Sequence, residues 1–180
     1  MKRFLFSFLI VGISEVLFSQ STLSPAEDGF TITEIIVKDS VSAKELLNRA
    51  TVWAQKKHPK YDKVNAVGGT TKVELEAEFK IKPKELNPPY DFTGKIVMHV
   101  KIEVKDGKYR YTINKVKHIA DNGKNSGGDI TKEIAECGSM FLPEMTWKKI
   151  KAEAIKDANV LAEDIKDAMS TPYKAVSDEW

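Results

Sequence analysis

Three glutamates at alternate positions form the first cluster whose spacing could support catalysis. Glu74, Glu76 and Glu78 lie where apolar and charged residues alternate, a pattern typical of a strand with one buried face. Alternate strand positions are about 6.8 Å apart, near the carboxyl separation of inverting glycosidases. Such an enzyme needs one carboxyl group whose pKa is raised by desolvation. Because Lys72 and Lys80 flank the glutamates on the same open face, we interpret them as solvating charges.

The three histidines are the next candidates, as metal ligands. His99 and His118 are both expected on the outward face of one hairpin, and His58 stands beside Pro59 after a helix. In the expected register His118 opposes Lys95, which places the two strand imidazoles roughly 13 Å apart. Two ligands of one zinc ion must each approach it to about 2.1 Å. We therefore predict two exposed strand histidines and no metal site.

The remaining reactive motifs are incomplete. The single cysteine, Cys137, excludes an internal disulfide and a cysteine-based metal cluster, and its acidic neighbour Glu136 favours an inert thiol. The glycine pairs match neither a phosphate-binding loop nor a serine-hydrolase elbow. The segment 121–129 is rich in oxygen ligands, but Ser126 and Lys132 replace the glycine and glutamate of an EF-hand. We predict no catalytic residues, no metal site and no cofactor.

Composition and charge narrow the classes of partner. Of the 180 residues, 42% are hydrophobic and 30% are charged, which is ordinary for a globular domain. The 28 Lys and Arg residues against 26 Asp and Glu residues leave a formal net charge of +2. A chain so nearly balanced lacks the long-range field that attracts nucleic acid. We therefore predict no nucleic-acid partner.

The beginning of the chain has the layout of a secretory signal peptide. Lys2 and Arg3 precede an apolar run at 4–13, and the small residues Ser19 and Ser21 mark the expected cleavage point. The run is shorter than the about 20 residues of a membrane span. A lipoprotein would need a cysteine at the cut. We expect a periplasmic or secreted protein that is not a lipoprotein and has no transmembrane segment after cleavage.

Local patterns in the rest of the chain predict a strand, a helix, four strands and a long helix. Ser42 and Glu45 form a capping box at the start of the first helix, and Pro59 follows its end. The expected ranges, in chain order, are 30–38, 42–57, 64–67, 70–81, 95–105, 108–119 and 143–170. Two helices on one face of an antiparallel sheet make an α+β fold. The expected signal peptide, linker, single α+β domain and tail are 1–20, 21–29, 30–170 and 171–180.

The most specific local signal is a hairpin turn. Asp106–Gly107 is a favoured type I′ turn between two strands of alternating character. A two-residue loop there places Val104 opposite Tyr109 on the apolar face and Glu103 opposite Arg110 on the polar face. Both faces agree with this single register, which supports the assignment.

Three stretches taken together resemble a known family. Residues 33–37, 42–53 and 102–113 carry a strand, a capped helix with one apolar face, and the hairpin turn, in this order. They are similar to an exported bacterial domain of unknown function that has a TATA-binding-protein-like (TBP-like) fold. The resemblance covers about 30–120 and leaves the loop and long helix at 121–170 outside it. It implies the strand–helix–four strands–helix order and brings no established activity; a helix-grip fold is the alternative architecture.

Three function classes follow from these observations. We predict a non-enzymatic, exported module that binds an unknown protein or surface polymer through the outward face of the hairpin. The alternative is a carrier of a small apolar ligand in a cavity between the sheet and the C-terminal helix. An enzyme, the third class, would need a strongly pKa-shifted carboxylate or histidine in a cleft. The candidate interaction residues are His99, Lys101, Glu103, Arg110, Thr112 and Asn114. The candidate cavity residues are Phe79, Ile102, Tyr109, Tyr111, Trp147 and Leu161.

Overall fold

The structure is a computed structural model that describes residues 29–83 and 90–172. The expected signal peptide, nearly all of the expected linker, residues 84–89 of the proline-rich connection and most of the expected tail lie outside the described residues.

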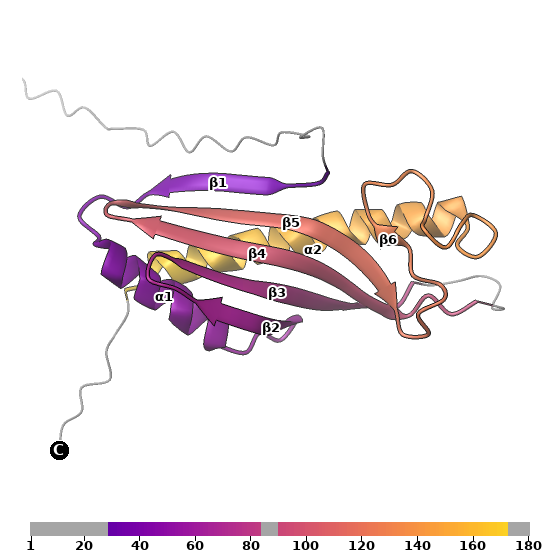
Figure 1. Ribbon diagram of the computed structural model, residues 1–180, viewed down its shortest axis with the longest axis horizontal. Helices are drawn as coiled ribbons and strands as arrows, with labels where there is room; N and C mark the ends of the chain where they lie inside the picture. The colour runs from indigo at the N-terminus through magenta and orange to yellow at the C-terminus, as the bar shows by residue number, and fades with distance from the viewer. Residues whose placement is uncertain (1–28, 84–89, 173–180) are drawn as a thin grey trace, which may run out of the picture.

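Six strands form an antiparallel sheet. Five of them follow the order β1-β5-β4-β3-β2, and the short β6 pairs with β5 (Figure 1). Among the five strands of this path, β1 and β2 are therefore the two edges of the sheet. The bounds are β1 Ile32–Val37, β2 Tyr61–Gly68, β3 Lys72–Ile81, β4 Gly94–Lys105, β5 Lys108–Ala120 and β6 Gly128–Asp129.

Two helices, α1 (Ala43–Gln55) and α2 (Glu144–Ser170), complete the fold. The predicted N-cap is present, because the hydroxyl of Ser42 accepts a hydrogen bond from the backbone N–H of Glu45 at 3.2 Å. The first helix lies against β2–β5 and against α2, and α2 runs behind the sheet along its length (Figure 1). The predicted α+β fold, with helices covering one face of an antiparallel sheet, is confirmed; β6 is an addition to the predicted order.

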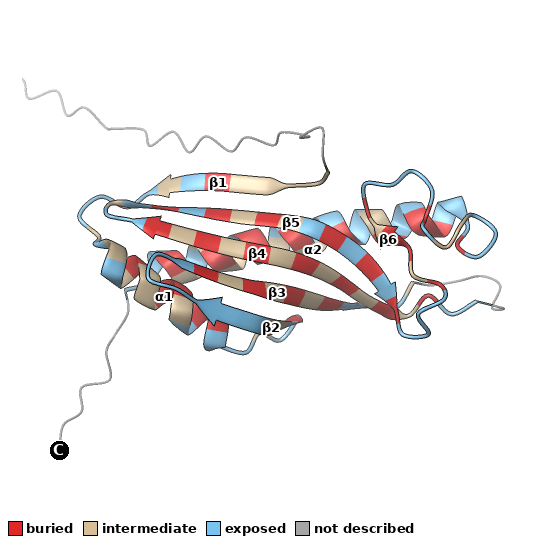
Figure 2. Cartoon of the chain, viewed as in Figure 1, coloured by how far each residue is buried: buried red, intermediate tan, exposed pale blue. Residues whose placement is uncertain are grey.

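The core lies between the sheet and the helices. Buried residues alternate with half-buried or exposed ones along β3 and β4, so that every second side chain points at the helices (Figure 2). Met98 and Val100 of β4 belong to one hydrophobic cluster with Leu46 of α1 and with Ile150 and Leu161 of α2, and all five are fully buried. One face of the sheet is thus committed to the core, and the other carries no helix within residues 29–83 and 90–172.

The hairpin between β4 and β5 confirms the predicted register near its turn, where Val104 pairs with Tyr109. Farther from the turn the register shifts between Val97 and His99, and Lys115 adopts a left-handed φ of 51°. A β-bulge places one extra residue in β5 and therefore reverses which side chains face inward beyond it. The prediction of an exposed His118 is wrong, because it faces the core with 0% exposure.

The segment 121–129 is also more ordered than its composition predicts. It contains β6, and the side chain of Asn125 is buried. The amides of Asn122 and Asn125 both donate to the backbone oxygen of Asp91, at 3.1 and 3.0 Å. These amides connect the segment to the chain that precedes β4.

Candidate functional site

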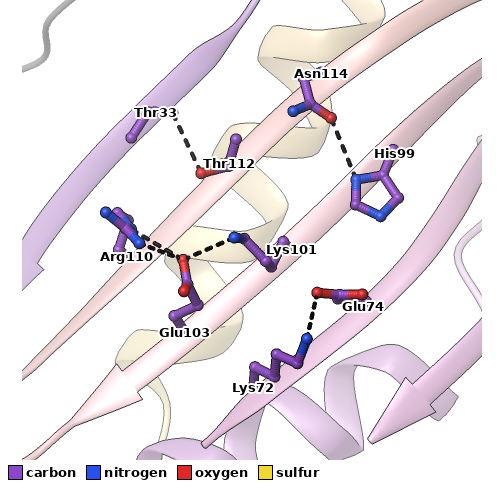
Figure 3. A network of polar contacts seen from close by, with 9 residues as sticks. All are labelled: Thr33, Lys72, Glu74, His99, Lys101, Glu103, Arg110, Thr112 and Asn114. Carbon is purple, nitrogen blue, oxygen red and sulfur yellow. Dashed lines mark hydrogen bonds and ion pairs between the residues drawn. The ribbon is translucent and has the colours of Figure 1, made fainter.

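The face of the sheet that no helix covers carries all six predicted interaction residues side by side on β4 and β5 (Figure 3). They form three cross-strand pairs. The cluster extends over four strands. On β1 it includes Thr33, which lies opposite Thr112, and on β3 it includes Lys72 and Glu74, which lie opposite Glu103 and Lys101. We call these nine residues the open-face surface: Thr33, Lys72, Glu74, His99, Lys101, Glu103, Arg110, Thr112 and Asn114.

Glu103 is the centre of the open-face surface. Arg110 donates to one of its oxygens from Nε at 3.0 Å and from Nη2 at 2.7 Å, and Lys101 lies 3.3 Å from the same oxygen. The hydrogen bond from Arg110 outweighs partial desolvation and holds the pKa of Glu103 below its usual range. All three side chains are about one third to one half exposed, so a partner can reach an already ordered charge cluster.

The remaining members are held by two hydrogen bonds between neighbouring strands and by one within β3. His99 Nδ1 lies 3.2 Å from Asn114 Oδ1, and Thr33 donates from its hydroxyl to that of Thr112 at 3.3 Å. Beyond β4, Lys72 donates to Glu74 at 2.9 Å. The surface therefore presents donors, acceptors and both signs of charge in a fixed order.

The three strand glutamates that could form a catalytic pair are instead each tied to a neighbour. Glu76 accepts from the amide of Asn65 at 2.7 Å, and Glu78 accepts from Lys95 at 2.6 Å. The hydrogen bond from Lys72 lowers the pKa of Glu74. A general acid needs the opposite shift, so Glu74 is unsuited to that role. Within residues 29–83 and 90–172, no group of three or more His, Cys, Asp or Glu could hold a metal ion.

A second polar cluster, which the sequence did not predict, lies where α1, β2 and α2 meet. The indole N–H of Trp53 donates to Asp164 Oδ2 at 2.6 Å, and the hydroxyl of Tyr61 donates to the same oxygen. Asp164 belongs to a run of charges on α2 that predicts only a solvated face. That interpretation is wrong for Asp164, because its two donors come from chain segments more than a hundred residues away.

Two basic groups surround this carboxylate. His58 Nε2 lies 3.8 Å and Lys63 Nζ 4.0 Å from its oxygens, and Lys63 also donates to two carbonyl oxygens near the end of α1. Burial alone would raise the pKa of Asp164, but the hydrogen bonds from Tyr61 and Trp53 and the nearby cations hold it below its usual value. Burial lowers the pKa of His58. Every polar group here is engaged with another element, which indicates a structural tie.

The opposite edge of the sheet has a carboxylate of its own. Glu34 of β1 is only 7% exposed and accepts a hydrogen bond from the hydroxyl of Tyr111 at 2.6 Å. Lys166 of α2 lies 3.7 Å from the same oxygen. Burial, followed by this hydrogen bond, raises the pKa of Tyr111.

The buried His118 holds the far end of β5. The backbone N–H of Gly127 donates to His118 Nδ1 at 3.0 Å, which assigns the ring proton to Nε2, 3.1 Å from the backbone oxygen of Phe92. Burial lowers the pKa of His118. Burial, with a smaller contribution from Glu136, also raises the pKa of Cys137, in the direction that the sequence predicts.

Comparison with known proteins bears on the sheet and α1. Residues 33–118 match the model of the family described as "Domain of unknown function (DUF4468) with TBP-like fold". This part of the chain is therefore similar to that family. The resemblance predicted from the sequence is therefore confirmed. No curated protein matches the chain.

Two solved structures share the architecture of this chain. A TBP-like protein from Parabacteroides distasonis is 14% identical, covers 84% of this chain and 100% of its own, and has a TM-score of 0.59. A DUF4468 family protein from Bacteroides ovatus is 9% identical, with 85% and 93% coverage and a TM-score of 0.57. At such identities the likeness establishes the TBP-like fold alone.

The family match contains all nine open-face residues but ends before α2. Both α2 residues that tie down the edges, Asp164 and Lys166, thus lie outside the matched DUF4468 segment. Neither helix of the described part is long and apolar enough to cross a membrane.

Proposed function

We propose that the protein is an exported, non-enzymatic binding module whose open-face surface contacts a protein or a surface polymer. One observation carries this proposal: the face of the sheet without helices holds a cluster of half-exposed, mutually paired polar side chains. Ordering such side chains before binding reduces the entropy that association would otherwise cost. The family that residues 33–118 match has no known function, so the site itself must support the proposal.

The chemistry of the open-face surface favours recognition over reaction. Each of its charges is paired within the surface, and Glu103 is bound by two cations at once. A partner with complementary charges can exchange these contacts for its own, which gives specificity and register more than raw affinity. Export is supported by the signal-like start of the chain, with Lys2 and Arg3 before an apolar run.

Site-specific crosslinking in the native host tests this function. A photoreactive amino acid at Thr112, on the open-face surface, is expected to capture a partner. The matched control places the same group at Ala152, an exposed position on α2. Arg110→Glu should weaken the capture at position 112, because it sets two carboxylates against each other. Equal capture at both positions, or capture unchanged by Arg110→Glu, contradicts the proposal.

Export is tested separately, by fractionating cells that express the whole chain. The protein should appear outside the cytoplasm, shortened near Ser19 or Ser21. A full-length protein that stays in the cytoplasm contradicts the proposal that the protein is exported. The proposal that the open-face surface binds a partner is then tested by the crosslinking experiment alone.

One observation favours the alternative, a carrier of a small apolar ligand. The hydroxyl of Tyr109 is buried and has no hydrogen-bond partner among the described residues, and such a group is stabilised by a ligand that bonds to it. Against this, the six candidate cavity residues are at most 3% exposed and pack in one core cluster. Native mass spectrometry of the protein purified from the exported fraction decides: an extra mass lost on organic extraction supports the carrier, and a bare protein mass contradicts it.

A further inference from the structure

The outer edge of β1 presents backbone groups that nothing in the described part of the chain pairs with. β5 is the only strand neighbour of β1 there. Lys38 donates from its backbone N–H to the oxygen of Gly107 at 2.8 Å, which fixes the phase of the antiparallel ladder. Because bonding residues alternate in such a ladder, the backbone groups of Thr33, Ile35 and Val37 point away from β5.

The side chains that β1 presents on the open face do not protect this edge. Exposed edge strands are commonly guarded by charges, prolines or bulges, which prevent another strand from pairing. The pairing of β1 with β5 is continuous over all six residues, without a bulge. On the open face, β1 carries only the uncharged Thr33, Ile35 and Val37, and the last two are each 54% exposed.

The surroundings define the side chains that a pairing strand would carry. Ile35 lies opposite Arg110 and Val37 opposite Lys108, and Lys108 pairs with Lys105. Neither of these two lysines has an ion-pair partner among the described residues. A groove of about 390 Å³ opens here, and its lining includes Ile35, Lys72, Glu103, Lys105, Lys108 and Arg110.

The other face of β1 sets a different requirement. Ile32 and Ile36 are partly buried and pack against the edge of the core. A strand added at about 4.8 Å from β1 would place every second side chain beside them, where an apolar, β-branched residue fits. The alternate side chains would lie on the open face, two strand spacings from Lys108 and within reach of its ammonium group.

We propose that the edge of β1 binds an extended segment of a partner protein, in which β-branched apolar residues alternate with acidic ones. The segment would add a strand to the sheet, with affinity from the backbone groups of Thr33, Ile35 and Val37. Its acidic side chains would pair with Lys108 of β5, and the charge of Lys105 on β4 would add to the attraction. This site goes beyond the open-face proposal, because it uses the backbone of β1 and stands whether or not the open-face surface binds a partner.

A labelled octapeptide, Ser-Val-Glu-Val-Glu-Val-Ser-Gly, tests the site by fluorescence anisotropy with the protein from the exported fraction. Ile35→Pro removes one outward N–H, and the outward phase of residue 35 leaves the ladder to β5 intact. We expect it to weaken binding about tenfold, by loss of one backbone bond and of the flat edge. The control Ile35→Thr keeps the N–H and should bind within about threefold of the unsubstituted protein.

Two altered peptides keep the test independent of any folding defect in the variant. Proline at the central valine should abolish binding, and lysine in place of both glutamates should weaken it at least about tenfold. The proposal is overturned if Ile35→Pro binds like Ile35→Thr, or if the lysine peptide binds as tightly as the acidic one. It is also overturned if sedimentation shows a dimer that Ile35→Pro disrupts and the acidic peptide does not, since the edge then belongs to a second copy.

Discussion

The two edges of the sheet are each tied to α2 through one carboxylate, but from opposite sides. At β2 the carboxylate lies on the helix, where Asp164 accepts from Trp53 and Tyr61. At β1 it lies on the strand, where Glu34 faces Lys166 of α2. Positions 164 and 166 are two residues apart and thus about 200° apart around the helix. One turn of α2 therefore reaches both edges of the sheet.

The two edge strands differ in the further contacts that each makes with the rest of the protein. Tyr61 of β2 stacks on Phe79 with ring centroids 4.7 Å apart and meets the ring of His58 at 4.2 Å. The pairing of β2 with β3 also shifts between Val64 and Val67, so this edge is bulged. β1 has neither a ring stack nor a bulge. A sheet can thus concentrate stability at one edge and keep the other regular enough to pair.

The largest expected effect tests whether stability is concentrated at β2. Trp53→Ala removes a side chain that is 3% exposed together with its hydrogen bond to Asp164, and should lower the free energy of unfolding by about 3–5 kcal/mol. Urea unfolding followed by circular dichroism measures it. Val52→Ala, at an exposed position of the same helix, is the control and should cost under about 0.5 kcal/mol. Similar losses in both variants would remove the basis of the comparison.

The next prediction separates the contribution of the hydrogen bonds to Asp164 from that of the packing around Trp53. Asp164→Ala leaves the indole of Trp53 and the hydroxyl of Tyr61 without their acceptor, and should cost about 2 kcal/mol. Asp164→Asn retains an acceptor oxygen and should cost about half as much. Asp167→Asn, an exposed neighbour on α2, serves as the control in the same urea titration. If Asp164→Ala is neutral, the cluster does not hold β2.

A smaller loss is expected at the β1 edge. Tyr111→Phe removes the hydroxyl that donates to Glu34 and should cost about 1 kcal/mol, because Lys166 still faces the carboxylate. Hydrogen exchange should show faster opening of β1 and unchanged β2. A cost that exceeds that of Asp164→Ala would reverse the ranking of the two edges.

The smallest effect is a pH dependence on the β1 side of the sheet. Burial lowers the pKa of His118, so the unfolded chain binds the proton first as pH falls below about 6.5. Stability is complete above this pH and is lost as pH falls toward the lowered pKa. His118→Gln should flatten this loss between about pH 7 and pH 5.

The other titrating groups contribute equally to the pH dependence of stability in both proteins, so the difference between the variant and the unsubstituted protein reports on His118. Asp157, whose pKa burial raises to about 6, acts in the opposite direction, because the folded state holds its proton more tightly. Thermal unfolding at several pH values measures the difference. An equal slope in both proteins would show that His118 is not the responsible group.

Much of the candidate site could be predicted because it depends on one register. The Asp106–Gly107 turn fixes which residues of β4 and β5 oppose each other, and alternation then places Glu103 beside Arg110 on the polar face. The ion pair between them follows from that placement. The prediction failed for His118, since nothing in the local pattern around Lys115 indicates a bulge.

The sequence by itself determined the helix cap at Ser42, the hairpin register near its turn, the covered face of the sheet and the family resemblance. Each depends on turn chemistry or on a repeat within a few residues, where the chain has few alternatives. Only the tertiary structure decided that Asp164 accepts from Trp53 and Tyr61, and that β1 and β2 are the edges. Those outcomes depend on segments far apart in the chain, which meet because the sheet and α2 share one core, and no local pattern encodes such a meeting.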